Sequence, residues 1–423
     1  MDETVAVIGL GYVGLPLACL CAKKGYSVIG IDINKDKINK INNGQSPIND
    51  EYVKENFLHN KIKATDDFSE IKNAKYVIVC VPTPVNEKHL PDLSYVREAS
   101  KSISENLQKN HIVIIESTVY PGTTEEIVLS ILESSGLKAG EDFFLAHCPE
   151  RIDPGNKKWT IEKIPRVVGG INNKSTEKAA ELYGKIIEAE IVEVKSSKEA
   201  EATKIMENTF RDVNIAFINE MAKSFDKAGI DIMDVIKGAS TKPFAFMPHY
   251  PGAGVGGHCI SVDPYYLIDR AKNYNFNHEF LKLARKINNS MPEYTVELLE
   301  DELKKLGENI KNAKIGILGL AYKANVDDTR KSPAFEIIKL LKEKGALVTV
   351  YDPYLPQKSA VSSLQELLNN ADYLVLVTNH KEFKEMELNL LKENNIKIVI
   401  DGRNCLDKEK IIKLGIRYKG IGR

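Results

Sequence analysis

The sequence predicts an α/β protein with two doubly wound parallel-sheet domains joined by a long helix. The chain has 423 residues, enough for two or three domains at roughly 150 residues each. Short apolar runs alternate with helix-length segments, as in a parallel sheet that helices cover on both faces. The same pattern starts again near residue 314, after a long stretch at 196–227 that contains neither Gly nor Pro.

The apolar runs of the first half define the first sheet. Each run is apolar on both faces and rich in β-branched residues, which is typical of buried parallel strands. The runs lie at 5–10, 28–32, 76–81, 111–117, 143–148 and 166–170.

The stretch at 196–227 has a helical pattern. Lys204, Asn208 and Arg211 are spaced i, i+4 and i+7 along it, so they share one face. A solvated polar face is one interpretation of this spacing. The apolar residues around the three, such as Phe210 and Phe217, instead indicate a helix buried on most sides. We expect this helix to form a spine between the two domains.

The second half repeats the architecture of the first. A Gly- and Pro-rich passage at 242–259 and a helical stretch near 278–306 come before it. Apolar runs then return at 314–322, 349–353, 373–378 and 396–403. In both halves a strand and a Gly-containing turn are followed by a strand that ends in an acid, Asp32 in one and Asp352 in the other. This weak repeat predicts a second sheet of the same kind.

The composition is that of a soluble, folded chain, with 43% apolar and 28% charged residues. A net charge of -1 gives no general field to attract nucleic acid. The N-terminus lacks the basic region of a secretory signal, and no later apolar run reaches the roughly 18 residues of a membrane span. We therefore expect a cytoplasmic protein without a membrane or nucleic-acid partner. The six cysteines form no CxxC pair, which argues against a disulfide framework and a structural metal.

A glycine-rich turn after the first run predicts a dinucleotide site. Gly9, Gly11 and Gly14 form GxGxxG between a strand and a helix, and Asp32 ends the next strand. Gly9 permits the tight turn, Gly11 lets a pyrophosphate approach the backbone, and Gly14 lets helix and strand pack closely. Asp32 can bind the ribose hydroxyls and would repel a 2′-phosphate, so the expected cofactor is NAD.

Three polar residues follow predicted parallel strands. Thr83 and Thr118 should lie at the carboxyl edge of the sheet, where ligands bind. Turn and cap chemistry is the alternative for both. Glu150 follows the run at 143–148 and either faces the same edge or caps a helix.

Cys259 is the candidate nucleophile. It ends a loop with four glycines between residues 252 and 257, which are costly in chain entropy unless the backbone bends sharply or a ligand comes close. If a helix starts at Cys259, its N-terminus lowers the thiol pKa, and Asp263 one turn on can hold a water or a proton. His258 is given no catalytic role. The alternative, an inert buried cysteine, is our expectation for Cys19, Cys21, Cys80 and Cys405.

The chain resembles the UDP-glucose/GDP-mannose dehydrogenase family in motifs that occur in the family's order. They are GLGYVGLPLA at 9–18, VPTP at 81–84, STVYPGTT at 117–124, CPERIDPGN at 148–156, the helix with Lys204 and Asn208, GVGGHCISVDP at 254–264 and AYKANVDDTR at 321–330. The resemblance implies an NAD-dependent, four-electron oxidation of a nucleotide sugar at C6, from primary alcohol to carboxylate. It also implies two Rossmann-like domains and a central helix that forms the core of a homodimer or of a dimer of dimers.

The resemblance assigns roles to the candidate catalytic residues. Cys259 matches the nucleophile, which traps the aldehyde as a thiohemiacetal that is oxidised to a thioester. Lys204 and Asn208 match the pair that steadies the developing oxyanion, and Asp263 matches the acid that completes this group. A thiolate can form the covalent intermediate, and a Lys with an amide offers donors where negative charge grows.

The remaining matches concern hydrolysis and binding. Glu150 matches the carboxylate proposed to assist thioester hydrolysis, Thr118 matches a residue that helps position water and nicotinamide, and the choice of Glu150 or Asp263 as base stays open. The predicted NAD contacts are Gly9, Gly11, Tyr12, Val13, Gly14, Asp32, Lys37, Thr83, Thr118 and Arg330. The predicted nucleotide-sugar contacts are Glu150, Arg151, Lys204, Asn208, Arg211, Tyr250, Gly256, Lys323 and Arg403.

One departure from the family pattern bears on the substrate. UDP-glucose dehydrogenases read NPEFLAEG where this chain reads CPERIDPG, so Pro154 replaces the second glutamate. The CPERIDPGN form, NTFRDVNIAFINE and GHCISVDPYYL resemble the branch that acts on UDP-N-acetylhexosamines, with Arg211 as a candidate for sugar recognition. GLGYVGLPLA and IPRVVGG favour UDP-N-acetylglucosamine, with UDP-N-acetylmannosamine second and UDP-glucose after it. A two-electron dehydrogenase of the 3-hydroxyacid type is a more distant alternative, since it also uses Lys and Asn on a helix.

We expect three parts along the chain. Residues 1–195 form an NAD-binding domain, and 196–306 form a central helical dimerisation region with Lys204, Asn208 and Cys259. Residues 307–423 form a UDP-sugar-binding, Rossmann-like domain.

Overall fold

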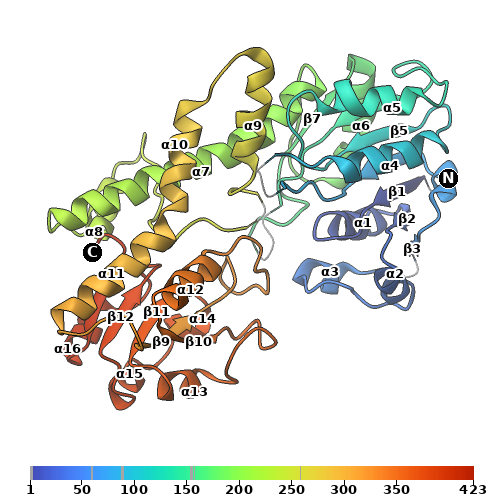
Figure 1. Cartoon of the computed structure of the whole chain (residues 1–423). Helices are drawn as coiled ribbons and strands as arrows, with labels where there is room; N and C mark the ends of the chain where they lie inside the picture. Colours follow the sequence, from blue (N-terminus) through green and yellow to red (C-terminus); the bar gives the residue numbers. More distant parts are fainter. Residues whose placement is uncertain (1–2, 59–60, 87–89, 153–155, 157, 258) are drawn as a thin grey trace. The chain divides into compact units, whose positions relative to one another are not determined.

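The computed structural model describes residues 3–58, 61–86, 90–152, 156, 158–257 and 259–423. The chain divides into two compact units: unit 1 is Met1–Glu207 with Tyr265–Phe276, and unit 2 is Asn208–Pro264 with Asn277–Arg423. Each unit contains one sheet, and the long helix α7 (Ser197–Lys227) contributes residues to both units (Figure 1). The predicted α/β class, the two doubly wound sheets and the long helix are confirmed.

The sheet of unit 1 has the strand order β3-β2-β1-β4-β5-β6-β7-β8. The strands are β1 (Thr4–Ile8), β2 (Ser27–Ile31), β3 (Ile62–Thr65), β4 (Tyr76–Val79), β5 (Ile112–Ile115), β6 (Phe144–His147), β7 (Arg166–Gly170) and β8 (Ile191–Glu193). All pairs are parallel except β6 with β7. The order reverses between β1 and β4, and their carboxyl ends therefore form the switch point where doubly wound sheets bind ligands. The edge strands β3 and β8 are additions to the predicted runs.

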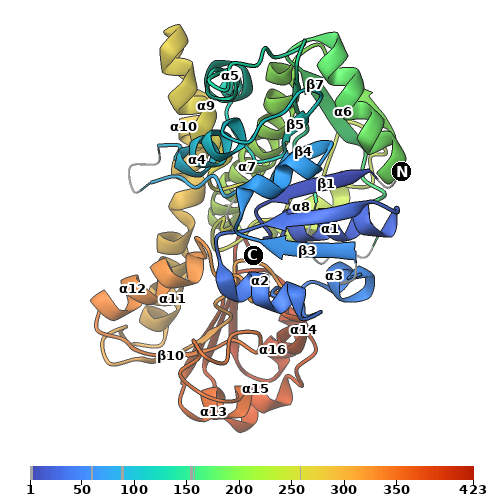
Figure 2. The same cartoon turned by 90° about the vertical axis from the view of Figure 1, so that its right-hand side faces the viewer.

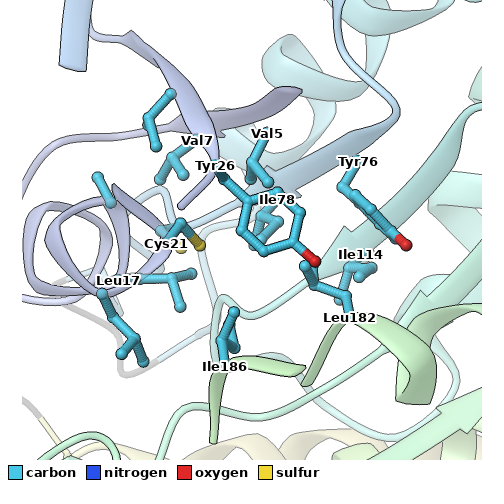
Figure 3. Packing of buried hydrophobic residues seen from close by; sticks show 14 of the residues in the cluster. Val5, Val7, Leu17, Cys21, Tyr26, Tyr76, Ile78, Ile114, Leu182 and Ile186 are labelled. Carbon is cyan, nitrogen blue, oxygen red and sulfur yellow. The ribbon is translucent and has the colours of Figure 1, made fainter. Parts of the chain in front are cut away.

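Helices cover both faces of this sheet. They are α1 (Gly14–Lys23), α2 (Lys35–Asn42), α3 (Glu51–Asn56), α4 (Ser94–Ser104), α5 (Leu129–Glu133) and α6 (Asn173–Ile186), with short helical turns η2 (Phe68–Asn73) and η3 (Thr124–Val128). Most of helix α9 (Asp263–Ala271) and the turn η4 (Lys272–Tyr274) also belong to unit 1. The apolar faces of α1, α3 and α6 form one core layer, and those of α4 and α5 form the other. In the first layer Tyr26 and Tyr76 meet edge to face, with ring centroids 6.4 Å apart (Figure 3).

The expected inert cysteines lie mostly in this core. Cys19, Cys21 and Cys80 are buried, and Cys21 faces the strands of the first layer (Figure 3). Burial raises the pKa of Cys19 to about 12 and raises that of Cys21 further. Cys405 differs, because its side chain is only partly buried.

The sheet of unit 2 is wholly parallel and has the order β10-β9-β11-β12-β13. Its strands are β9 (Lys314–Leu318), β10 (Leu347–Tyr351), β11 (Tyr373–Leu376), β12 (Ile398–Asp401) and β13 (Arg417–Gly420). The helices that follow α7 in this unit are α8 (Ile232–Ala239), α10 (Glu279–Asn289), α11 (Met291–Lys305), α12 (Pro333–Glu343), α13 (Leu364–Asn369), α14 (Lys381–Lys384), α15 (Asn389–Glu393) and α16 (Lys408–Lys413). One face packs on α8, α11, α12 and the end of α7, and the other packs on α13 to α16 (Figure 2). The order reverses between β9 and β11, so this sheet has its own switch point.

One helical prediction is confirmed with an added break, and another needs correction. The stretch near 278–306 is two helices, because α10 ends at Asn289 and Pro292 stands in the first turn of α11, where its missing N–H costs nothing. Helix α7 is also buried differently from the prediction: Lys204 and Asn208 are buried, whereas Phe210 is 45% and Phe217 54% exposed. Its polar face is the buried one, because the polar groups have partners there. Its aromatic face is partly exposed, and Phe210 meets the ring of His249 edge to face.

Among the described residues, no helix is both long enough and apolar enough to cross a membrane.

Candidate active site

The turn between β1 and α1 lies at the switch point of unit 1. Gly9 has a φ of 92°, and a Cβ there would lie 2.7 Å from the carbonyl oxygen of Cys80, so only glycine fits this turn. A Cβ at Gly14 would overlap the carbonyl oxygen of Gly9. A Cβ at Gly11 would meet no atom within 4 Å. Gly9 and Gly14 therefore serve the turn and the packing, and Gly11 borders open space.

A cavity of about 590 Å³ lies at this turn. Its walls come from the ends of β1, β2 and β4, from the start of α2 and from α4. The lining residues include Gly9, Asp32, Asn34, Lys37, Phe68, Val81, Pro82, Tyr95 and Glu98. A site of this size at the carboxyl edge of a parallel sheet matches the binding place of one half of a dinucleotide.

Asp32 is held in a fixed orientation at the wall of this cavity. Its Oδ2 accepts the Leu10 N–H at 2.9 Å, and its Oδ1 accepts the Asn34 N–H at 2.9 Å. The Nζ of Lys37 lies 3.3 Å from Oδ2. Backbone amides thus orient the carboxylate, and the predicted Lys37 lies beside it.

The other predicted NAD contacts of unit 1 lie around this region. Tyr12 is exposed and Val13 partly buried at the start of α1. Thr83 is buried, and its carbonyl accepts the O–H of Tyr266. The cavity itself is lined by the two residues before it, Val81 and Pro82.

The segment that carries Thr118 is tied to helix α7 by Glu201. The carboxylate of Glu201 accepts the N–H of Gly122 at 2.5 Å and the N–H of Thr124 at 2.7 Å. Glu201 is fully buried, and burial raises its pKa to about 7 although these N–H groups favour the carboxylate. Glu201 precedes Lys204 by about one helical turn. The side chain of Glu201 therefore links the segment of Thr118 to the part of α7 that carries Lys204.

Glu150 lies at the carboxyl end of β6 beside a buried charge cluster. Its Oε1 accepts the N–H of Ile152 and lies 4.0 Å from Nη1 of Arg166 on β7. The same Nη1 lies 3.9 Å from Oε2 of Glu116, and Tyr183 donates its O–H to Glu116 at 2.5 Å. Burial alone would lower the pKa of Arg166, but the carboxylates around it raise that pKa, so the guanidinium stays charged.

The predicted sugar contact Arg151 is already engaged within unit 1. Its guanidinium forms an ion pair with Glu207 at 2.6 Å and donates to the carbonyl of Pro165 at 2.9 Å. Positions 153–155, which include Pro154, lie outside the described residues, as does His258.

Cys259 belongs to unit 2 and is exposed. Its carbonyl accepts the N–H of Val262 at 3.0 Å and of Asp263 at 2.9 Å. Helix α9 begins at Asp263, so the conditional expectation of a helix starting at the thiol itself is wrong by one turn. Asp263 is buried, and its Oδ2 accepts an amide N–H of Asn208 at 2.6 Å. Unit 2 therefore joins Asn208, Asp263 and the turn of Cys259, while Lys204 lies in unit 1.

The glycines before Cys259 serve close packing of protein segments. Gly254 and Gly257 have φ values of 139° and 88°, which other residues rarely adopt. A Cβ at the predicted contact Gly256 would lie 2.7 Å from the Cβ of Tyr322. Gly252 donates its N–H to Asn219 of α7 at 3.0 Å. The loop is thus held between α7 and the loop after β9.

Three predicted cations lie at the carboxyl edge of the unit 2 sheet. Lys323 and Arg330 are on the loop after β9, and Arg403 lies two residues after the end of β12. Arg403 donates to the carbonyl of Val377 at 2.8 Å. Arg330 pairs with Asp328 at 2.6 Å, which raises the Arg330 pKa. The carbonyl of Arg330 accepts the N–H of Gly257 at 2.9 Å, so this loop contacts the nucleophile loop.

Arg211 and Tyr250 are both exposed. Tyr250 lies two residues before Gly252, where a Cβ would be 2.9 Å from Nη1 of Arg403.

Three models of one family match the chain in succession. The NAD binding domain of the UDP-glucose/GDP-mannose dehydrogenase family matches residues 3–187, the central domain matches 198–290 and the UDP binding domain matches 316–408. The chain belongs to this family. It is an NAD-dependent nucleotide-sugar dehydrogenase, and NAD is its cofactor.

Relatives of this dehydrogenase cover its whole length. It is 39% identical to a UDP-N-acetyl-D-mannosamine dehydrogenase of Pyrococcus horikoshii, over 99% of both chains. It is also 39% identical to a UDP-N-acetyl-D-glucosamine 6-dehydrogenase of Pseudomonas aeruginosa, over 97% of this chain and 98% of that one. The solved structure of the Pyrococcus horikoshii UDP-D-ManNAc dehydrogenase superposes with a TM-score of 0.92 at 38% identity, covering 100% of this chain and 99% of that chain.

NAD fits the residues of unit 1. The open space at Gly11 admits a pyrophosphate to the backbone, and the oriented carboxylate of Asp32 can accept ribose hydroxyls. Sequence reasoning missed Tyr95 and Glu98 of α4, which line the cavity, because that helix is remote in the chain. It also missed Glu201, although a Glu at the start of a long helix near a motif is a signal that could have found it.

Proposed function

We propose that this dehydrogenase oxidises the C6 alcohol of a UDP-N-acetylhexosamine to the carboxylate through covalent catalysis by Cys259. The observation that carries the proposal is the 39% identity, over 97% or more of the chain, to relatives named for UDP-N-acetylmannosamine and UDP-N-acetylglucosamine. The exposed thiol beside the buried Asn208–Asp263 pair supports the covalent route.

The proposed chemistry forms and breaks one carbon–sulfur bond. The C6 alcohol loses a hydride and a proton to become an aldehyde, and the Cys259 thiolate attacks its carbon to give a thiohemiacetal. A second loss of hydride and proton gives a thioester, which water cleaves to the carboxylate and the free thiol. NAD held in unit 1 would take up one hydride in each oxidation, so two NADH would form per sugar.

Lys204 and Asn208 are proposed to stabilise the negative oxygen that develops on C6. A buried ammonium and an amide N–H are effective donors when they are oriented before the reaction. Asn208 uses one N–H on Asp263, and the amide carries a second. Asp263 therefore fixes the orientation of Asn208 in this proposal.

The base for thioester hydrolysis is proposed to be Glu150, with Asp263 as the alternative and Thr118 positioning the water. Glu150→Gln should complete both oxidations once and then stop as the thioester. Mass spectrometry of the protein after mixing with substrate and NAD should show an adduct on Cys259. If Asp263→Asn accumulates the adduct and Glu150→Gln turns over normally, the base is Asp263.

The sugar is the part of the proposal that needs a direct assay. The sequence features favour UDP-N-acetylglucosamine as the substrate. UDP-N-acetylmannosamine is the second candidate, and the Pyrococcus horikoshii relative is named for that sugar. A panel of these two with UDP-N-acetylgalactosamine and UDP-glucose, scored by NADH release, assigns the substrate. Two NADH per sugar support the proposal, and one NADH would indicate a two-electron dehydrogenase instead. The product would be a uronic acid for surface polysaccharide.

The covalent step is tested with Cys259→Ser. We expect this variant to bind NAD and to release no uronate, whereas the matched control Cys405→Ser should keep full activity. Iodoacetamide should inactivate the wild-type enzyme, and the nucleotide sugar should protect it. Full uronate production by Cys259→Ser would exclude the thioester route.

We also propose a homodimer, or a dimer of dimers, that covers the aromatic face of α7. Phe210 and Phe217 are exposed one above the other on this helix, and Phe244 and Met247 extend the same apolar groove in unit 2. Exposed apolar patches of this kind typically mark protein interfaces, and the notably uncharged groove suits a second copy of the same face. Phe217→Glu should shift the mass measured by light scattering to that of a monomer.

The division into an NAD-binding part (1–195), a central dimerisation part (196–306) and a UDP-sugar-binding part (307–423) remains part of the proposal. The three matched family domains support it. A cytoplasmic location remains a prediction.

A further inference from the structure

Asp352 is the counterpart in unit 2 of the NAD-site acid Asp32. Each directly follows the second strand of its sheet motif, β2 or β10. Each accepts the N–H of a residue in the turn after the first strand, Leu10 at 2.9 Å for Asp32 and Leu320 at 2.7 Å for Asp352. Asp352, however, is fully buried. Its Oδ2 also accepts the N–H of Ala321 at 2.9 Å, and its Oδ1 accepts that of Tyr354 at 2.9 Å.

His380 fills the place beside Asp352. It follows β11 and is fully buried, with Nε2 3.1 Å from Oδ2 of Asp352. The ring of Tyr354 stacks on it, with centroids 4.8 Å apart and planes 22° from parallel. Burial alone would raise the Asp352 pKa, but the hydrogen bonds from His380, Leu320 and Ala321 lower it below its ordinary value. The acid is therefore a protein-bound carboxylate that cannot receive a ribose.

The second nitrogen of His380 binds the loop after β9. Nδ1 lies 2.9 Å from the backbone N of Asn325 and accepts its N–H. Because Nδ1 is the acceptor, the hydrogen sits on Nε2 and is donated to Asp352, which fixes the tautomer. The residue after His380 adds a reciprocal bond, since the Lys381 N–H donates to Oδ1 of Asn325 at 2.9 Å.

The loop held in this way carries two of the cations assigned to ligand binding. Lys323 lies two residues before Asn325, and Arg330 lies five after it. Asn325 has a φ of 61°, in the left-handed region that Asn adopts more readily than most residues, and the two bonds with His380 and Lys381 hold it there. On its other side the loop contacts the nucleophile loop, through the N–H of Gly257 and the carbonyl of Arg330 at 2.9 Å.

We propose that His380 is a positioning residue for the nucleotide sugar: its Nδ1 fixes Asn325 and with it the loop of Lys323 and Arg330, while Asp352 holds the ring. This inference rests on the proposed function, because it takes Lys323 as a contact to the nucleotide sugar. In this proposal Asp352 binds His380 and not a ligand, and so it helps to fix the shape of the nucleotide-sugar site.

Two variants of His380 separate the two ring nitrogens. In His380→Asn the side-chain oxygen can replace the Nδ1 acceptor for Asn325, and the bond to Asp352 is lost. In His380→Gln the amide nitrogen can replace the Nε2 donor to Asp352, and the acceptor for Asn325 is lost. Both remove an aromatic ring from the same buried position, so each controls for the packing loss of the other.

The readouts are UDP binding by calorimetry and the KM for the nucleotide sugar, with NAD binding as the control for unit 1. We expect His380→Gln to weaken UDP binding and to raise this KM by about tenfold, which is the upper end of the usual net effect of losing one hydrogen bond. His380→Asn should stay within about threefold of wild type, and kcat and NAD binding should change little in either. Equal effects of the two variants, or none, would overturn the positioning role.

A UDP measurement also separates this inference from the proposed function. UDP lacks the sugar and needs neither Cys259 nor turnover. If no UDP-N-acetylhexosamine is oxidised but UDP binds more weakly to His380→Gln than to His380→Asn, the proposed substrate is wrong and the positioning role stands. If Lys323→Ala binds UDP and nucleotide sugar as wild type does, the loop is not a ligand contact and the inference fails.

Discussion

Replacement of Glu201 by Gln should change how the stability of unit 1 depends on pH. Burial raises the pKa of Glu201 to about 7, and the ordinary value of 4.5 applies once the chain unfolds. The native state therefore holds the proton more tightly, and its contribution to stability is fully present below pH 4.5 and is lost as the pH rises through 7. The gap between 4.5 and about 7 corresponds to about 3 kcal/mol, since each pH unit is worth about 1.4 kcal/mol.

The glutamine variant removes this titration. Its side chain can accept one of the N–H groups of Gly122 and Thr124 and opposes the other with an amide N–H, which costs about 1 to 3 kcal/mol at acidic pH. The variant should therefore be less stable than wild type at pH 5, and the difference should shrink towards pH 8.

The measurement is urea unfolding between pH 5 and pH 8, followed by the fluorescence of Trp159. The sequence contains one Trp, and it lies in unit 1, so its signal reports that unit. Glu220→Gln, an exposed change on the same helix, is the matched control and should leave the pH curve as in wild type. Parallel curves for wild type and Glu201→Gln would refute the assignment of this titration to Glu201.

Three further outcomes are expected. Asp32→Ala should raise the KM for NAD by about tenfold while leaving UDP binding intact, and equal losses of both ligands would contradict a cofactor-specific role. Gly14→Ala should destabilise unit 1 and weaken NAD binding, because the new Cβ would overlap the carbonyl of Gly9. Gly184→Ala in α6 is the control, because its new Cβ would meet no atom within 4 Å. This control should stabilise unit 1 by roughly 0.5 to 1 kcal/mol in the same unfolding assay. Arg166→Met leaves buried Glu116 without its cation and should cost about 3 to 5 kcal/mol of unfolding free energy, and a loss below 1 kcal/mol in the Trp159 signal would show that the guanidinium is not needed to balance that charge.

The central strands of both sheets were predictable because a strand that is buried on both faces consists of a continuous run of apolar residues. The run at 5–10 became β1 and that at 396–403 became β12 for this reason. Edge strands carry a weaker signal. In β3, Lys63 is exposed between buried neighbours, and β13 reads Arg-Tyr-Lys-Gly because only one of its edges is paired.

The candidate site was predictable where it depends on local chemistry. The glycine turn and Asp32 are close in the chain, and the turn geometry follows from residue type alone. Residues that act over long sequence separations were not predictable. Arg166 lies 50 residues after Glu116, and the residues around neither position form a pattern that predicts an ion pair.

Helix α7 shows why the polar pattern misled the prediction of burial. Polar residues on its buried face bind partners far along the chain: Asp212 pairs with Arg285 at 2.5 Å, and Asn219 binds both Asn288 at 2.9 Å and the N–H of Gly252 at 3.0 Å. A buried polar face is stable only when such partners satisfy it. The bond between Asn219 and Gly252 also holds the glycine loop against α7. Burial of the polar face of α7 therefore serves to position this loop. The aromatic face has no such constraint within the described residues, which leaves it available for a second copy of the chain.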